Sequence, residues 1–147
     1  MKTNYYIFLM ACFLITSCSK VNNEQDSKDL SITTYPQTWN LVKMTGNIPG
    51  SVSIGEELEW QEKYVFKSDV TFVKSRISDG EMESASGTYS FNEDTQNFIL
   101  NYEQTSAIIG NCGSNIQESL YFNEESKILQ SNWWACDGPG LFYERGK

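Results

Sequence analysis

Apolar and polar side chains alternate in short runs from residue 39 to the end of the chain, and turn residues separate these runs. In residues 97–102, for example, Phe98, Leu100 and Tyr102 fall on one face of an extended chain. A period of two is the pattern of a half-buried strand, and turn signals about every eight to twelve residues are typical of all-β folds. No run of ten or more residues has the apolar spacing of an amphipathic helix. The pattern therefore predicts an all-β domain.

The predicted strands follow one another closely along the chain. They cover residues 39–44, 62–67, 70–77, 86–91, 97–102, 104–109, 116–123, 127–133 and 141–145, with the least regular alternation in 104–109. Short turns join most of them, which describes an antiparallel meander. A flat meander of this length would expose two edges, and closure into a barrel removes them. We therefore expect an antiparallel up-and-down barrel of about eight strands over residues 36–147.

Alternation assigns one set of large side chains to the interior of this barrel. The set comprises Trp39, Leu41, Tyr64, Phe66, Tyr89, Phe91, Phe98, Leu100, Leu120, Phe122 and Leu129. A barrel of this size encloses a space that side chains can just fill, or that can hold one small ligand. Large aromatic residues at most inward positions favour a filled barrel. If a pocket is present, we expect its lining to include Trp39, Tyr64, Phe66, Tyr89, Phe91, Glu118, Phe122 and Trp133.

Among the charged residues of the predicted strands, Glu118, Lys74 and Arg76 bear most on the interior of the barrel. Glu118 has the same parity as Leu120 and Phe122, which places its carboxyl group inside the barrel. A carboxyl group there must be hydrogen-bonded, protonated, or paired with a cation such as Lys74 or Arg76. These two cations share one face of their strand. We expect that face to be the outer surface; the alternative is an inward face that receives an anionic group of a ligand.

The N-terminal segment has the pattern of a targeting signal. Lys2 precedes an uncharged apolar run at 5–15, which is shorter than the about 20 residues that span a bilayer and fits a signal peptide. Residues 15–18, Ile-Thr-Ser-Cys, resemble a bacterial lipobox. The resemblance implies that residues 1–17 are a signal peptide and that Cys18 is lipidated; an ordinary secretion signal with an incidental cysteine is the alternative. Residues 18–35 would then be the lipidated N-terminus and a flexible polar stalk.

A lipid anchor would place the protein in the bacterial cell envelope. We expect it at the outer membrane, facing the periplasm or the cell surface. Removing residues 1–17 takes away Lys2 and no acidic residue, so the formal net charge goes from −8 to −9. Anionic headgroups repel such a body, so the lipid and not a charged patch is the expected membrane attachment. The same negative charge excludes binding to a nucleic-acid backbone.

Cys112 and Cys136 are the cysteines left in the domain once the signal peptide is removed and Cys18 is lipidated. If the two predicted strands around Glu124 form a hairpin, both cysteines stand twelve residues from its pivot and meet at its open end. Disulfides persist outside the cytoplasm, so we predict a disulfide between them. A redox-active pair is the alternative, but neither cysteine has a basic neighbour to lower its thiol pKa.

The residue types present exclude most catalytic chemistry. The chain has no histidine, which removes Ser–His and Cys–His catalysis and histidine-ligated zinc. The acidic runs 56–59 and 124–125 could supply a general acid and base, as in glycosidases, but carboxylates in solvated turns are far more often only solvated. The turn at 137–140 lacks the oxygen spacing of a calcium loop. We expect no enzymatic activity, no cofactor and no metal.

Trp133 and Trp134 form the most conspicuous local feature of the chain. On a strand, adjacent side chains point to opposite faces, so one ring would enter the barrel and the other would point outward. The outward ring could stack on a sugar or on a partner's side chain, or it could cover the disulfide. We favour the structural role.

Four motifs carry a family resemblance. They are residues 39–42 (WNLV), 64–72 (YVFKSDVTF), 87–91 (GTYSF) and 136–145 (CDGPGLFYER). In this order, and behind a lipobox, they resemble the small lipocalin-like lipoproteins common in Bacteroidota. The resemblance spans about residues 36–147 and implies an up-and-down barrel with no settled activity. Gln37 stands where true lipocalins carry the glycine of their Gly-x-Trp signature.

Two hypotheses for function follow. The first is a membrane-tethered, non-catalytic barrel that binds a small apolar or amphipathic ligand. The alternative is a filled barrel that presents its outer surface and loops to an envelope protein or a host molecule. An interior cavity would distinguish the two.

Overall fold

A computed structural model describes residues 34–46, 48, 50–113 and 116–147. The expected signal peptide, the expected lipidation site Cys18 and residues 19–33 of the expected stalk lie outside the described residues. The strands are β1 (Gln37–Thr45), β2 (Val52–Ile54), β3 (Gln61–Phe66), β4 (Thr71–Ser78), β5 (Glu81–Asn92), β6 (Asn97–Tyr102), β7 (Gln117–Asn123), β8 (Ile128–Ser131) and β9 (Gly140–Arg145). Two short 3-10 helices are η1 (Gly55–Glu57) and η2 (Trp133–Cys136). Within the described residues, no helix has the length and apolar character needed to cross a membrane.

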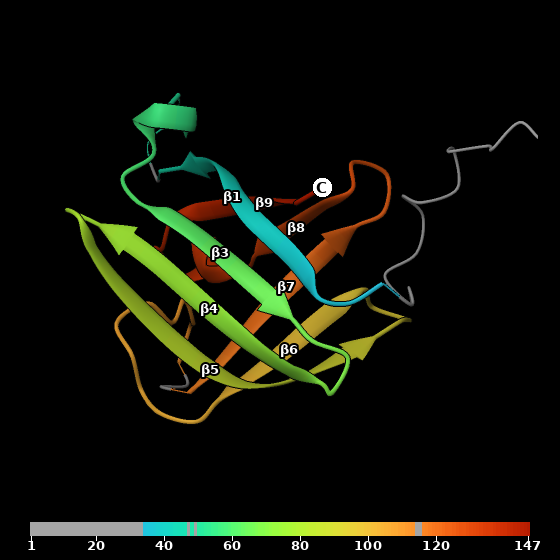
Figure 1. The fold of residues 1–147 in the computed structure, drawn as a ribbon. Coiled ribbons are helices and arrows are strands. Elements are labelled where there is room, and N and C mark those ends of the chain that lie inside the picture. Colours follow the sequence, from blue (N-terminus) through green and yellow to red (C-terminus); the bar gives the residue numbers. More distant parts are fainter. Residues whose placement is uncertain (1–33, 47, 49, 114–115) are drawn as a thin grey trace, which may run out of the picture.

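Eight of the strands form a closed antiparallel barrel, which confirms the predicted fold (Figure 1). Consecutive strands from β3 to β9 pair with one another, and β1 closes the barrel by pairing with both β3 and β9. The register between β1 and β9 shifts between Leu41 and Lys43, which is a bulge that bends β1 where the barrel closes. The additional strand β2 pairs with the end of β1.

Eight of the predicted strands are present, but the prediction of a strand at residues 104–109 is wrong. The Ser106 hydroxyl accepts a hydrogen bond from the Ile108 backbone N–H at 3.3 Å, which turns the chain there. The last predicted hairpin strand also ends early, at Ser131, whose hydroxyl accepts the Trp133 backbone N–H at 3.1 Å. Sequence reasoning misses β2, because its three residues are largely exposed and give no alternating signal.

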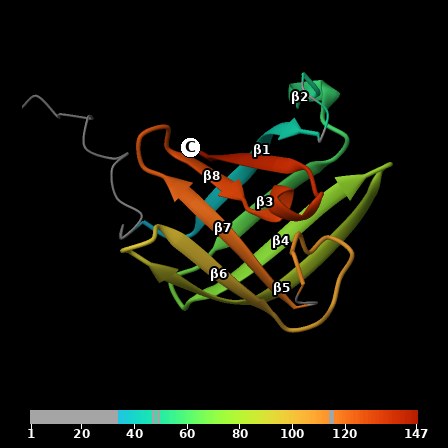
Figure 2. The same cartoon turned by 180° about the vertical axis from the view of Figure 1, so that it is seen from behind.

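The two ends of the barrel are built differently (Figure 2). At one end, here called the short-turn end, the connections are the tight turns 67–70, 93–96 and 124–127. Residue 34 and the C-terminus also lie at this end, where the Gly146 N–H donates to the Thr38 carbonyl at 2.7 Å. At the other end, the long-loop end, the chain runs through 46–60, 103–116 and 132–139, and through the β4–β5 turn at Asp79 and Gly80.

Aromatic rings fill the half of the interior nearest the short-turn end. The Phe66 ring centroid lies 4.9 Å from that of Tyr89, 5.0 Å from that of Phe98 and 6.2 Å from that of Phe72. Trp39 packs edge-on against Phe122 at 5.8 Å. Tilted and edge-to-face arrangements of this kind add to the free energy gained by burial. The predicted inward set is buried or packed against the buried core throughout.

Candidate functional site

Four charged side chains meet in the other half of the interior, near the long-loop end, and are here called the ionic cluster. They are Glu62 of β3, Lys74 and Arg76 of β4, and Glu118 of β7. Lys74 Nζ lies 3.2 Å from Glu62 Oε1 and 3.1 Å from Glu118 Oε1. Arg76 Nε donates to Glu62 Oε2 at 2.5 Å. The Glu62, Lys74 and Glu118 side chains are 0% exposed.

Three tyrosine hydroxyls complete the ionic cluster. Tyr64 donates to Glu118 Oε1 at 2.9 Å, and Tyr102 donates to Glu118 Oε2. Tyr143 donates to Glu62 Oε1 at 2.5 Å. Burial raises the pKa of all three hydroxyls above the ordinary 10.0, and the neighbouring carboxylates raise it further. The hydroxyls therefore stay protonated at neutral pH and serve as donors.

The ionic cluster is balanced in charge and buried, and only its Arg76 side chain, at 12%, is partly exposed. Its two cations face two carboxylates, and the tyrosines donate further hydrogen bonds to the same carboxylates. Buried charges persist only with such a complete set of partners. A general acid or nucleophile must reach a substrate, and these carboxylates do not. Among the described residues, no group of three or more Cys, Asp or Glu side chains could hold a metal ion.

Residues 103–113, here called the capping loop, lie against the ionic cluster at the long-loop end. Ile108 is 2% exposed and Ile109 is 8% exposed. Arg76 Nη2 donates to the Ile108 carbonyl at 3.4 Å. A Cβ atom at Gly110 would lie 3.0 Å from Glu118 Oε1 and 2.9 Å from the Trp133 ring, so only glycine lets the backbone come this close. The capping loop thus seals the interior at this end.

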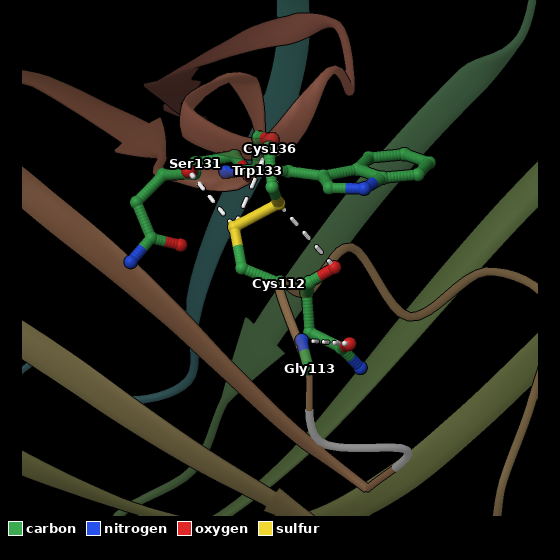
Figure 3. Close-up of a disulfide and its surroundings, with 7 residues drawn as sticks. Cys112, Gly113, Ser131, Trp133 and Cys136 are labelled. Atoms are coloured by element: carbon green, nitrogen blue, oxygen red, sulfur yellow. Dashed lines mark hydrogen bonds between the residues drawn. A yellow bond between two sulfur atoms is a disulfide. The ribbon is translucent and has the colours of Figure 1, made fainter.

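The predicted disulfide between Cys112 and Cys136 is confirmed, with an S–S distance of 2.04 Å (Figure 3). It joins the capping loop to η2. Trp133 begins η2 and packs against the core, and a Cβ atom at Gly138 would lie 2.4 Å from its ring. The expectation that Trp133 lies on a strand is wrong. One ring is nevertheless packed inward and the other, Trp134, is exposed.

The residues expected to line a ligand pocket are all buried or packed against the buried core. Tyr89, Phe91 and Trp133 are half-buried against the core. The other five are between 0% and 5% exposed, namely Trp39, Tyr64, Phe66, Glu118 and Phe122. A side chain with almost no exposed area adjoins neither bulk solvent nor a void that could hold water. The structure therefore offers no room for a ligand at these five residues.

The expectation that Lys74 and Arg76 lie on the outer surface is wrong. The register of β3 and β4 places Lys74 opposite Tyr64 and Arg76 opposite Glu62, all on the inward face. The predicted inward position of Glu118 and its pairing with Lys74 are present. Sequence reasoning misses Glu62 and Tyr143. Glu62 shares the parity of Tyr64, a signal that could have found it.

Exposed large apolar side chains gather at the long-loop end. Of the ten in the described residues, seven lie on its loops or on the adjoining strand ends: Ile48, Val52, Ile54, Ile77, Met82, Ile116 and Trp134. Tyr35 and Val70 lie at the short-turn end, and Tyr121 lies within β7. This end therefore carries most of the exposed large apolar side chains of the described residues, and exposed apolar patches are typical of interaction sites.

The fold and its interior define a closed antiparallel β-barrel that is filled by its own side chains. Comparisons of the chain with protein-family models, with curated proteins and with solved structures find no match.

Proposed function

We propose that this protein is a lipid-anchored, non-catalytic β-barrel of the bacterial cell envelope that contacts another envelope component or a host molecule through its long-loop end. The observation that carries the proposal is the concentration of exposed apolar side chains at that end. Loops carried by a rigid scaffold are the usual place for binding residues. The lipobox-like residues 15–18 and the family resemblance support the envelope location.

The point at which the chain enters the barrel supports this orientation. Thr34 precedes β1 at the short-turn end, where Arg145 Nη2 donates to its hydroxyl at 2.8 Å. A lipid on Cys18 would therefore connect to the short-turn end. The long-loop end would then be the part of the barrel farthest from the point of anchoring, and the part most open to a partner.

A small apolar or amphipathic ligand inside the barrel is the weaker candidate function. Its best support is the capping loop, which covers a polar interior and would have to move for a ligand to enter. That movement would break the contact between Arg76 and the Ile108 carbonyl and would expose the ionic cluster. Exposure of one side of a balanced buried cluster is costly, so the closed, filled state is favoured.

Site-specific photo-crosslinking in the cells of origin tests the proposal. A photoreactive residue at Met82, which is 72% exposed at the long-loop end, should form adducts with a discrete partner. The matched control is Val70, which is 54% exposed at the short-turn end and should form few. No adducts at Met82, or equal adducts at both positions, would contradict the proposal.

The anchor has a separate test. Cys18→Ala should leave the protein soluble or unprocessed in a membrane fractionation, because the acyl chains provide the attachment. Unchanged partitioning of this variant into the detergent phase would contradict the lipidation of Cys18.

A further inference from the structure

β5 has one edge towards β4 and a second edge towards β6, and the second edge is paired over only part of the strand. β4 pairs with it from Glu81 to Thr88, whereas β6 pairs with it from Gly87 to Asn92. Among the described strands, none pairs with the second edge over residues 81–86. This part of the β4–β5 hairpin extends past the neighbouring strands at the long-loop end (Figure 1). An unpaired strand edge is a template for pairing with another chain.

The backbone groups of Met82 and Ser84 point to this open edge. The Glu103 N–H donates to the Ser86 carbonyl at 3.0 Å, so Ser86 directs its backbone groups away from β4. Every second residue of a strand directs its N–H and C=O to the same side, so Ser84 and Met82 do likewise. In the described part of the chain, their outward backbone groups have no hydrogen-bond partner.

A surface groove of about 240 Å³ lies between the open edge of β5 and the capping loop. Its lining is Glu83, Ser84, Ala85, Ser86, Glu103, Gln104, Thr105 and Ser106. Glu83 accepts the Ser106 hydroxyl at 2.6 Å, and Glu103 accepts the Ser86 hydroxyl at 3.0 Å. Neither carboxylate has a cationic partner among the described residues, since the ion pairs there belong to the ionic cluster. The groove therefore carries uncompensated negative charge beside open backbone donors and acceptors.

We propose that this edge binds an extended, lysine- or arginine-rich segment of a partner protein, which adds a strand beside residues 82–84. The inference rests on the proposed function and names the chemistry of its partner. Strand addition takes its affinity from main-chain hydrogen bonds, which Met82 and Ser84 are placed to make. Cations on the incoming strand meet Glu83 and Glu103, which favours basic segments over acidic ones.

A second copy of this chain is a poorer occupant of the edge. Antiparallel pairing of two β5 edges would bring Glu81 and Glu83 of one copy towards the same residues of the other. Like charges opposite each other on paired strands are destabilising. The net charge of −8 over the whole chain adds long-range repulsion between copies.

A peptide titration of the full mature protein in detergent tests the edge directly. The probe is a capped peptide of alternating lysine and threonine, about seven residues long, and the control replaces lysine with glutamate. The lysine peptide should shift the amide NMR resonances of residues 82–86 and 103–106, and the glutamate peptide should not. Equal shifts from both peptides, shifts spread over the whole barrel, or no shifts at millimolar peptide would overturn the proposal.

Three variants separate backbone pairing from charge. Ser84→Pro removes an outward donor and leaves the bonds to β4 in place, so the Kd of the lysine peptide should rise about tenfold or more. The double variant Glu83→Gln with Glu103→Gln should raise the Kd of the lysine peptide and should make that Kd depend less on the salt concentration. The matched control, Glu93→Gln with Glu125→Gln, makes the same charge change in exposed turns at the short-turn end and should leave the Kd unchanged. If Ser84→Pro does not fold, the paired glutamine variants decide the outcome, and an unchanged Kd overturns the proposal.

The crosslinking experiment distinguishes failure of this inference from failure of the proposed function. If Met82 adducts persist unchanged in a Ser84→Pro background, the strand edge is not the binding element, while the long-loop end remains the contact face. If Met82 gives no adducts in the parent protein, the proposed function itself fails. Light scattering that shows dimers of the parent protein and monomers of Ser84→Pro would assign the edge to a second copy and overturn the basic partner.

Discussion

The two halves of the barrel interior are filled by different chemistry. Near the short-turn end, aromatic rings pack around Phe66, and tight turns join the strands outside. Near the long-loop end, the ionic cluster fills the interior, and a disulfide and the capping loop hold the outside together. The aromatic half gains stability from area and shape, so it tolerates modest change. The ionic half depends on every partner being present.

Removing the central cation should have the largest effect. Lys74→Met leaves Glu62 and Glu118 buried without their shared cation, so the free energy of unfolding should fall by about 3–5 kcal/mol, measured by urea unfolding. Adding Glu118→Gln to this variant should restore part of the loss, because one uncompensated charge is then removed. If Lys74→Met lowers the free energy of unfolding by less than about 1 kcal/mol, the ionic half is not the more sensitive of the two halves.

Opening the disulfide should have the next largest effect. Cys112→Ser with Cys136→Ser removes a constraint on the unfolded chain and should lower the free energy of unfolding by about 3 kcal/mol. Hydrogen exchange of the native variant should speed up in the capping loop and η2, and stay slow around Phe66 and Phe98. Faster exchange spread equally over both halves would contradict a local role for this bond.

A substitution in the aromatic half should lower the free energy of unfolding by a smaller amount. Phe98→Leu loses the ring contacts with Phe66 and Phe91 and keeps most of the volume, so it should cost about 1–1.5 kcal/mol in the free energy of unfolding. Combined with Lys74→Met, its effect should be additive, because the two sites lie in separate halves. A coupling free energy above about 0.5 kcal/mol in the double-mutant cycle would show that the halves act as one unit.

Raising the pH into the alkaline range should destabilise the ionic half. Small pH changes around neutrality should not affect it through these tyrosines. The pKa values of Tyr64, Tyr102 and Tyr143 are raised above 10.0 in the folded protein. A raised pKa contributes stability that is complete below the unfolded-state pKa and is lost as the pH rises beyond it. The free energy of unfolding should therefore fall from about pH 10 upwards. Phenolate absorbance tests this, and full titration of all tyrosines near pH 10 with the fold intact would be the contrary result.

The same contrast explains what the sequence could predict. In the aromatic half, parity alone places Phe66, Phe98 and Phe122 inside, because regular hairpins conserve the alternation. Parity also places Glu118 inside. Parity with the buried Phe72 also places Lys74 and Arg76 inside, and it was their charge that favoured the outer surface. Their inward position is stable because Glu62, which is 0% exposed, pairs with both. That pairing depends on register and closure, which no local pattern encodes.

The loops were predictable only where a covalent or spacing constraint applied. The disulfide was predicted from the equal spacing of Cys112 and Cys136 about Glu124, and it is present. The hairpin itself is centred between residues 125 and 126, and the two cysteines lie beyond its strands, in the capping loop and η2. The capping loop did not follow from its sequence. Ile108 and Ile109 are adjacent and both buried, which no strand pattern produces, because adjacent residues of a strand face opposite sides. The open edge of β5 could not be predicted from the sequence either, because it depends on where β6 stops pairing with β5 in the folded barrel.

Native mass spectrometry of the full mature protein, purified from its own cells, tests the filled barrel most directly. The structure predicts the mass of the mature chain, with any covalent lipid it carries, and no further small molecule, because the five most deeply buried of the residues expected to line a pocket have almost no exposed area. A sample that has been unfolded and refolded should give the same mass. A stoichiometric apolar molecule that is present before unfolding and absent afterwards would contradict the filled barrel and restore ligand binding as the function.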